Sequence, residues 1–309
     1  MNHITQSLRT AELTGWVARD TLTTLDHVYP QRDPAPSLDP DLIPTERAGV
    51  MFEVDHDRLV ALAASSDCCL ELLWAVGDFV PADAALIKVS GDPVALDRRQ
   101  VLRAVALGPE RTMNQDVAYG MRMLVDIAER SLASGPFADP TTAVQAIDRL
   151  HDVLRQIARR PLHSGRYRDD GGSTRLIVPT LQWDGFVSLT FDEIRRAGAG
   201  SPQVVRRLRA ALDDLLDAVP PSHRPALQQQ VALLDDQAGT AAPTDRDRRD
   251  ALVADPSGLG SSRDLTAPPG QRRHPVTSAH PGDRLALTPA PRPDRWRWCR
   301  TPSRSGRAA

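Results

Sequence analysis

The sequence predicts an α+β protein that is mainly helical and carries a small α/β module of β-α-β-β order and one β-hairpin. Two observations lead to this class. Between residues 48 and 92, apolar residues form short runs typical of strands, such as GVMFEV and ALIKV, around one helical segment. Between residues 93 and 239 they recur mostly at the three- and four-residue spacing of amphipathic helices, and one Asp-Gly-Gly turn interrupts them.

The first predicted element is an amphipathic helix over residues 1–30. Its apolar residues keep roughly helical spacing: Ile4, Leu8, Ala11, Leu22, Leu25 and Val28. Pro30 ends the helix, and four further prolines make residues 31–47 a predicted linker. A helix that stands apart from the next domain needs cover for its apolar stripe. We therefore expect residues 1–29 to bind a partner chain or a membrane surface.

Residues 48–92 are predicted to form the α/β module. GVMFEV is its first strand, and DHDRLVALAASS begins a helix with Asp55 or Asp57 near the N-cap. CCLELLWAV then fits a buried strand, and ALIKV closes the module after the loop VGDFVPAD. Nothing in this pattern requires catalysis, so a role in packing or in presenting a surface is expected.

Residues 93–239 are predicted to form a helical domain. The first helix is expected in DPVALDRRQVLRAVAL, and the others over residues 114–132, 141–159, 182–197, 201–219 and 221–237. The stretch RYRDDGGSTRLIVP, near residues 166–178, predicts a hairpin of two short strands. After Gly239 the helical spacing stops and ten prolines follow. Residues 240–309 are therefore predicted to be a disordered tail rich in proline and arginine.

Composition and motifs exclude several classes of function. A net charge of −2 and 4 % aromatic residues give no reason to expect nucleic-acid binding. No apolar run of about 18 residues and no signal peptide are recognisable, so the chain as given is expected to be cytoplasmic. Cys68, Cys69 and Cys299 lack metal-ligand spacing. Glycine-rich nucleotide motifs and nucleophile elbows are missing, so no metal, cofactor or small-molecule substrate is predicted.

The stretch ADPTTAVQAIDRL, residues 138–150, is the most distinctive start of a predicted helix. Asp139 suits the N-cap, Pro140 suits the first turn, and Thr141 or Thr142 can add a hydroxyl near the free N–H groups. The main interpretation is a well-capped helix. The alternative is that Asp139, Thr141 and Thr142 surround a helix N-terminus that binds an ion, and the acid favours a cation over a phosphate.

A second group of candidates consists of Arg111, Asp116, Asp126 and Asp148. Asp116 opens one predicted helix, and the other two acids lie among the apolar stripes of two helices that should be neighbours. Pairing with arginine, such as Arg122 or Arg149, is the main interpretation. The alternative is that two carboxylates face a shared cavity, where they bind a cation or act as acid and base. The arginines at residues 206, 207 and 209 are expected near helix ends or on exposed faces.

Three segments carry a resemblance to a known family. They are Arg111-Thr112 with Gln115-Asp116, then LVDIA at residues 124–128, and DPTTAV at residues 139–144. Together with GDFVPADAALIKV, LIVP and FDEIRRAGAGSPQVVRRL, they make residues 2–238 resemble the bacterial family named domain of unknown function 2254, described as predicted membrane proteins. Asn114 and Ala138 are departures, because the family pattern leads us to expect an acid and an asparagine there.

The resemblance implies that the chain corresponds to the cytoplasmic portion of such a protein, at the cytoplasmic face of the membrane. Family members typically carry several transmembrane helices before the segment that residues 1–30 resemble. This helix is therefore expected to adjoin the membrane, and residues 1–29 to contact a membrane-embedded partner or a second copy in a homo-oligomer.

The expected function is a non-enzymatic interaction or regulatory domain. The alternative is a cation-dependent, hydrolase-like enzyme that uses the clustered carboxylates of Asp116, Asp139 and Asp148. The candidate ligand-binding residues are Arg111, Gln115, Asp116, Asp139, Thr141, Thr142 and Asp148.

Overall fold

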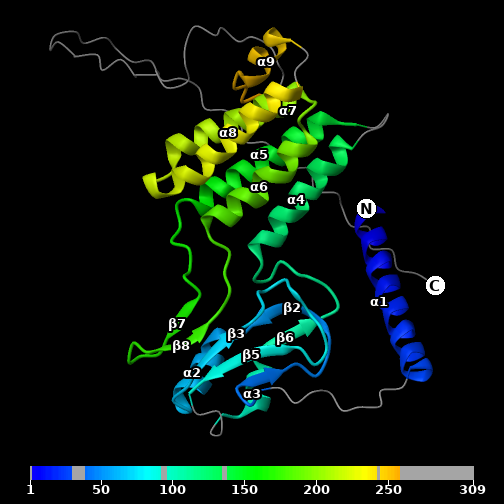
Figure 1. Ribbon diagram of the computed structural model, residues 1–309, viewed down its shortest axis with the longest axis vertical. Coiled ribbons are helices and arrows are strands. Elements are labelled where there is room, and N and C mark those ends of the chain that lie inside the picture. The colour runs from blue at the N-terminus through cyan, green and yellow to red at the C-terminus, as the bar shows by residue number, and fades with distance from the viewer. Residues whose placement is uncertain (1, 30–38, 92–95, 134–137, 242–243, 258–309) are drawn as a thin grey trace, which may run out of the picture. The chain divides into compact units, whose positions relative to one another are not determined.

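A computed structural model describes residues 2–29, 39–91, 96–133, 138–241 and 244–257 (Figure 1). Its helices are α1 (Asn2–Val28), α2 (His56–Ser65), α3 (Arg98–Arg103), α4 (Val117–Leu132), α5 (Pro140–Ile157), α6 (Trp183–Ala197), α7 (Pro202–Ala218), the 3-10 helix η1 (Pro221–His223), α8 (Arg224–Ala241) and α9 (Asp245–Leu252). Its strands are β1 (Leu42–Pro44), β2 (Gly49–Val54), β3 (Cys69–Leu72), β4 (Phe79–Val80), β5 (Ala85–Ser90), β6 (Val105–Gly108), β7 (Arg166–Arg168) and β8 (Thr174–Ile177). The predicted class, α+β and mainly helical, is confirmed.

The strands form two sheets in the α/β module. One has the order β1-β5-β3-β8-β7 and the other the order β4-β2-β6. Met51, Leu70 and Ile87 of three different strands are fully buried in the core of this module. The helix α2 begins at Asp55 as expected, since the Asp55 carboxylate accepts a hydrogen bond from the Arg58 N–H at 3.0 Å.

The predicted hairpin is confirmed as β7 and β8, which pair through Tyr167 and Leu176. It does not stand alone within the helical domain, because β8 joins β3 in parallel with Leu70 opposite Leu176. The Arg175 side chain strengthens this attachment through ion pairs with Asp67 at 2.8 Å and Asp169 at 2.6 Å. The hairpin therefore belongs to the five-stranded sheet.

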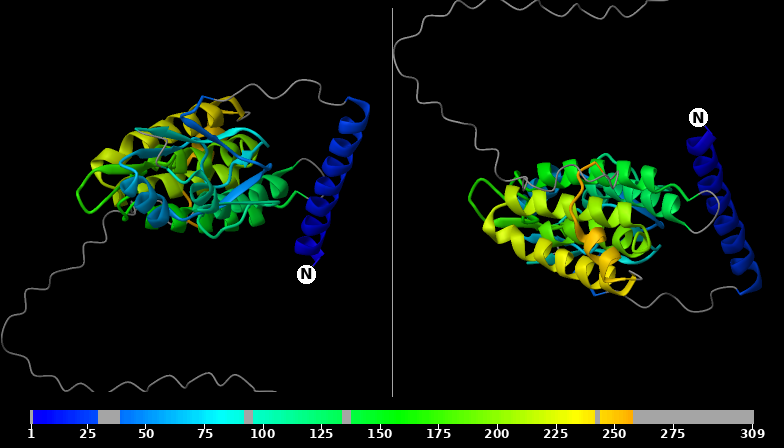
Figure 2. Two further views of the ribbon diagram at one scale, coloured as in Figure 1. Left: turned by 90° about the horizontal axis from the view of Figure 1, so that it is seen from below. Right: turned by 90° about the horizontal axis from the view of Figure 1, so that it is seen from above.

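The helices α4 to α8 form a separate layer and run side by side (Figures 1 and 2). Their amphipathic faces meet in one core that includes Val125, Leu150, Phe191 and Leu208. Trp183 fixes the turn before α8, because its indole N–H donates to the His223 carbonyl at 2.8 Å and its ring stacks on the His223 ring.

Several segments differ from their predicted structure. In the predicted loop VGDFVPAD, residues Phe79–Val80 form β4 and pair with β2. Residues 31–47 were predicted as a linker, yet residues 42–44 form β1 and pair with β5. The helix predicted over DPVALDRRQVLRAVAL is wrong after Arg103, where β6 pairs with β2. The alternate burial of Val105 and Leu107 explains the strand, since both side chains fill the module core. Residues 92–95 of that predicted helix lie outside the described residues.

The predicted tail also differs at its start. Residues 245–252 form α9, which Thr244 caps through a bond from the Asp247 N–H at 3.2 Å. Ala251 is buried, and the Asp255 N–H donates to the Arg206 carbonyl of α7 at 3.3 Å. A cap and a few contacts with α7 thus order a segment that lacks helical apolar spacing. Residues 258–309 of the predicted tail lie outside the described residues.

Gly165, just before β7, takes a backbone conformation that favours glycine and lies against the Val178 backbone, which allows a stability test. A Cβ atom there would lie 2.2 Å from the Val178 carbonyl oxygen, and the backbone φ is +75°. Gly165→Ala should lower the free energy of unfolding by more than about 2 kcal/mol. Gly172→Ala is the matched control, because Gly172 has φ of +81° but nothing within 4 Å of a Cβ. It should cost only about 1 kcal/mol. Equal losses in urea denaturation would contradict this account.

Candidate functional site

The half-buried Arg111 and the buried Asp116 form an ion pair at the start of α4. The Asp116 carboxylate accepts hydrogen bonds from the Arg111 Nε at 2.6 Å and from the Tyr119 N–H at 2.9 Å. Only 4 % of the Asp116 side chain is exposed. The Arg111 guanidinium also lies over the Tyr119 ring, 5.2 Å from its centroid. One carboxylate therefore caps the helix and neutralises the arginine at the same time.

Gln115 joins the same helix start to the α/β module. Its amide oxygen accepts from the Val54 N–H at 3.0 Å, and its amide nitrogen donates to the Val54 carbonyl at 3.2 Å. Gly77 lies beside the pair, since a Cβ there would come within 2.5 Å of both the Arg111 Nε and the Asp116 carboxylate. The structure thus brings Arg111, Gln115 and Asp116 together, and their bonding atoms face protein groups.

The residues at the start of α5 form a separate group. The Asp139 carboxylate accepts from the Thr141 N–H at 3.1 Å, the Thr142 N–H at 3.2 Å and the Thr142 hydroxyl at 2.6 Å. These bonds, that of the Thr142 hydroxyl above all, lower the pKa of Asp139. Asp139, Thr141 and Thr142 therefore bond mainly to one another, in the arrangement of a helix cap.

Asp148 lies in a polar network between α5 and α7, which we call the seam network: Asp148, His151, Arg155, Arg207 and Asp214. The Arg207 Nε donates to Asp148 at 2.6 Å, and another guanidinium nitrogen of Arg207 lies 3.0 Å from the His151 Nδ1. The His151 Nε2 lies 2.8 Å from the Asp214 carboxylate, which also pairs with Arg155.

The protonation of His151 follows from these contacts. Arg207 has only N–H donors, so the His151 Nδ1 must accept, and the Nε2–H must donate to Asp214. Burial lowers the pKa of His151; the bond to Asp214 opposes this, and the positive charges of Arg207 and Arg155 add to it. His151 is therefore neutral at neutral pH. Burial raises the pKa of Asp214, but the bonds from Arg155 and His151 outweigh it, so that pKa is lowered.

The three carboxylates required by the hydrolase alternative do not form a cluster. Asp116 is bound to Arg111, Asp139 caps α5, and Asp148 is bound to Arg207. Over the described ranges, no group of three or more histidine, cysteine, aspartate or glutamate side chains has the arrangement of a metal site.

Some of the predicted pairings are right and some are wrong. Asp126 pairs with Arg122 at 2.6 Å as expected. Asp148 pairs with Arg207 on another helix and not with the suggested Arg149. Arg207 is not on an exposed face, since only 7 % of its side chain is accessible. Its position among Val204, Leu208 and Ala211 on one helical stripe was the available signal, and sequence reasoning missed it.

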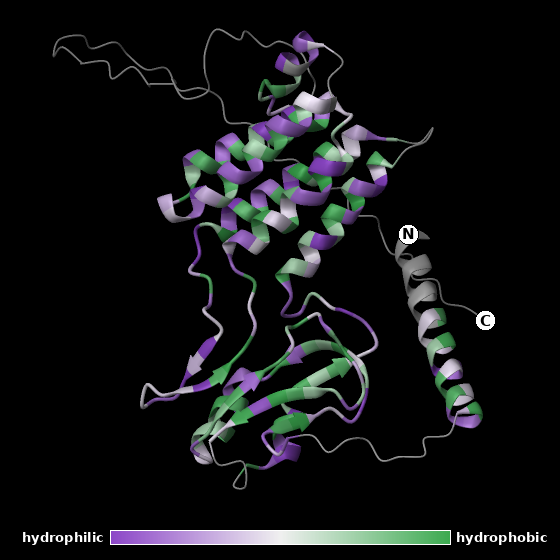
Figure 3. Ribbon diagram, in the orientation of Figure 1, coloured by the Kyte–Doolittle hydropathy of each residue, from purple (hydrophilic) through white to green (hydrophobic). Residues whose placement is uncertain are grey.

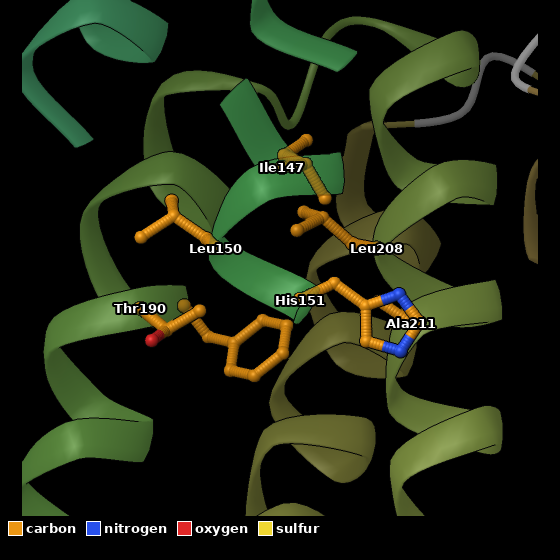
Figure 4. Close-up of a pocket in the computed structure, with 7 residues that line it drawn as sticks. Ile147, Leu150, His151, Thr190, Leu208 and Ala211 are labelled. Atoms are coloured by element: carbon orange, nitrogen blue, oxygen red, sulfur yellow. The ribbon is translucent and has the colours of Figure 1, made fainter. Parts of the chain in front are cut away.

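Hollows in the described part of the helical layer include the following. One is enclosed by α5, α6 and α7 and lined by Ile147, Leu150, His151, Thr190, Phe191, Leu208 and Ala211 (Figure 4). It has no space for a water molecule, so it is a feature of core packing. The other is an open depression of about 260 Å³ between α4 and α5, lined by Leu124, Ile127, Thr142, Gln145, Ala146, Asp148 and Arg149.

The protein is an α+β scaffold. The polar residues that the sequence singles out as site candidates cap its helices or join one helix to another or to the α/β module. The chain belongs to the family described as Predicted membrane protein (DUF2254), which matches residues 1–214. It is 32% identical over 250 residues to the Uncharacterized protein Rv1290c of Mycobacterium tuberculosis and, to the same degree, to the Uncharacterized protein Mb1321c of Mycobacterium bovis. Each match covers 76% of this chain and 48% of the relative, so the chain spans about half the length of these relatives. No solved structure matches the chain significantly.

The family description raises the question of a membrane-spanning helix. In the part of the chain that the structure describes, no helix combines the length and the apolar character needed to cross a membrane.

The caps of α4 and α5 give a paired prediction. Asp139→Ala removes an exposed cap and should cost about 1 kcal/mol of unfolding free energy. Asp116→Ala removes a cap and also leaves the Arg111 guanidinium without its partner, so it should cost at least about 2 kcal/mol. Chemical denaturation of both variants measures the difference. A larger loss for Asp139→Ala would show that the roles assigned to the two carboxylates are wrong.

The seam network predicts how stability depends on pH. The unfolded chain protonates His151 near its ordinary pKa of 6.5, whereas the folded chain resists protonation to lower pH. The contribution of neutral His151 to the free energy of unfolding is therefore complete above about pH 6.5 and is lost as the pH falls below that value. His151→Gln, which cannot titrate, should lose less unfolding free energy than the wild type between about pH 7.5 and 5.5.

His56→Gln serves as the control for this measurement. Burial also lowers the pKa of His56, which belongs to α2 in the other layer. Each variant should therefore reduce the pH dependence of the unfolding free energy by its own amount. In the double variant the two amounts should add. An unchanged pH dependence in His151→Gln would refute the assigned protonation of the seam network.

Proposed function

We propose that the chain is a non-enzymatic interaction or regulatory portion of a membrane protein, located at the cytoplasmic face. One observation carries the non-enzymatic part: Asp116, Asp139 and Asp148, the acids that the sequence nominates for catalysis, each bond to the chain's own cationic or N–H groups. Each of these carboxylates therefore accepts hydrogen bonds from the chain itself, and the three do not converge on a shared site.

Membership in a family described as membrane proteins supports the cellular location. The described side chains of α1 support a role in binding, since Leu13, Trp16, Leu22, Leu25 and Val28 are between 47% and 59% exposed. Exposed apolar side chains grouped on one helix are typical of a surface that contacts a partner. Residues 1–29 then meet a second copy of the chain or a membrane-embedded partner. Neither nucleic acid nor a small-molecule substrate belongs to this proposal.

The contacts at the start of α4 offer a route for regulation. Gln115 holds Val54 of β2, and Gly77 of the module packs against the Arg111–Asp116 pair. A partner that displaces one layer therefore disturbs the N-cap of α4 in the other.

Cell fractionation tests the proposed location. In bacteria that carry the native gene, the protein should sediment with membranes. A protease added outside intact spheroplasts should leave it uncut, while inside-out vesicles should expose it. Recovery in the soluble fraction, or cleavage from outside, would remove the basis of the proposal.

Metal addition tests the non-enzymatic part. Since no cluster of three or more described metal-ligating side chains has the arrangement of a metal site, Mg²⁺ or Mn²⁺ at about 1 mM should leave the melting temperature unchanged within about 1 °C. A rise that disappears in Asp148→Asn, but not in the exposed control Asp170→Asn, would instead support a cation site at Asp148.

A further inference from the structure

Three flat rings lie face to face where the hairpin packs on α2. The Tyr167 ring of β7 stacks on the His56 ring of α2, with 4.5 Å between the centroids and 13° between the planes. It also stacks on the His163 ring, with 4.2 Å and 26°. Two rings on one face of Tyr167 would overlap, so the two imidazoles cover opposite faces. We call His56, Tyr167 and His163 the ring stack.

The strand β7 brings little apolar surface to its packing. It is an edge of the five-stranded sheet and is hydrophilic along its length (Figure 3). Arg166 and Arg168 are exposed, whereas Tyr167 is half-buried and packs against the core of the module. An edge strand of this composition gains little free energy from burial. The rings on both faces of Tyr167 therefore hold β7 against α2.

His163 joins the ring stack to both chain segments that connect the hairpin with the helical layer (Figure 1). Its carbonyl accepts from the Thr180 hydroxyl and from the Gln182 side-chain amide, each at 3.3 Å. Its Nδ1 accepts from the N–H of the buried Gly165 at 2.9 Å. An imidazole whose Nδ1 accepts has its hydrogen on Nε2 and is neutral. Protonation of His163 would set a second donor against the Gly165 N–H and break this bond.

The surroundings of His56 also favour a neutral ring. Burial lowers the pKa of His56 most, and the positive charge of His163 lowers it further. Asp57 and Asp55, at the start of the same helix, oppose this effect without cancelling it. The two histidines of the ring stack therefore repel each other when both are protonated.

Other charges lie on the elements that pack against α2, which are β3, β7, β8 and α3. Their charged residues are Glu71, Arg98, Arg99, Arg103, Arg166, Arg168 and Arg175. Most of these arginines are exposed, so solvent screens them, and Arg175 is paired with Asp67 and Asp169. Burial, His163 and the two acids of α2 therefore govern the protonation of His56.

We infer that the ring stack is a pH-sensitive clasp, which holds the segment before β7 on α2 while both imidazoles are neutral and releases it when they are protonated. The released rings bind protons more readily than the stacked rings. Release is therefore favoured as the pH falls below about 6.5, the ordinary pKa of histidine. The clasp would provide regulation within the proposed function, but its existence rests on the ring contacts alone.

Hydrogen–deuterium exchange of the full chain tests the clasp. It is measured by mass spectrometry at about pH 7.5 and 5.5 and corrected for the intrinsic exchange rate. A peptide that covers residues 162–168 should lose protection about tenfold at the lower pH, because each imidazole kept neutral in the clasp contributes up to about tenfold per pH unit. Peptides from the core helix α6 should lose less.

His56→Phe combined with His163→Asn removes both titrating groups and keeps their contacts. A phenyl ring can stack on Tyr167, and an asparagine oxygen can accept from the N–H two residues further on, which is that of Gly165. This double variant should keep its protection at about pH 5.5. His151→Gln is the control, because it removes a partly buried histidine outside the ring stack. It should lose protection over residues 162–168 as the wild type does.

Three results would overturn the clasp. The first is equal protection of residues 162–168 at both pH values in the wild type. The second is a loss in the double variant as large as in the wild type. The third is an equal loss in α6, which would mean that acid loosens the whole chain.

The single variant His163→Asn keeps the test decisive if the double variant fails to fold. It retains His56 and should show a smaller loss than the wild type, so an equal loss would also overturn the clasp. The proposed location and the absence of catalysis would survive each of these results, because fractionation and metal addition test them separately.

Discussion

The buried guanidinium of Arg207 is the constraint on which the helical layer depends. A cation with 7% of its side chain exposed must find partners, since an unpaired buried charge costs several kcal/mol. Asp148 and His151, three residues apart on α5, supply these partners. Their contacts with Arg207 fix the register of α5 against α7. His151 also bonds to Asp214, a second residue of α7, so each helix donates a hydrogen bond to the other.

The same demand explains the contacts of the other acids that the sequence singles out. Asp116 neutralises Arg111 and caps α4, while Asp139 bonds to the first N–H groups of α5. Each acid satisfies groups that folding would otherwise leave unpaired. Exposed apolar side chains remain on the described part of the chain, such as Leu22 and Leu25 of α1 and Val117 and Ile127 of α4. Binding through surfaces, and not chemistry in a cavity, is therefore the function that we propose.

Much of the fold could be predicted because it follows from local patterns. Helical spacing located α4 to α8, and the Asp-Gly-Gly turn located the hairpin. β1, β6 and α9 escaped prediction because their structure depends on distant partners: β5 for β1, β2 for β6 and α7 for α9. The caps at Asp116 and Asp139 are local and were predictable. The partner of Asp148 was not, since Arg207 lies 59 residues away in the sequence.

A double-mutant cycle between Asp148 and Arg207 tests most directly the claim that these polar residues serve the fold. The unfolding free energies of Asp148→Asn, Arg207→Gln and the double variant would be compared with that of the wild type. We predict that the double variant loses less than the sum of the single losses, with a coupling energy above about 1 kcal/mol. Losses that add within about 0.3 kcal/mol would show that the two side chains act independently, and would contradict the account.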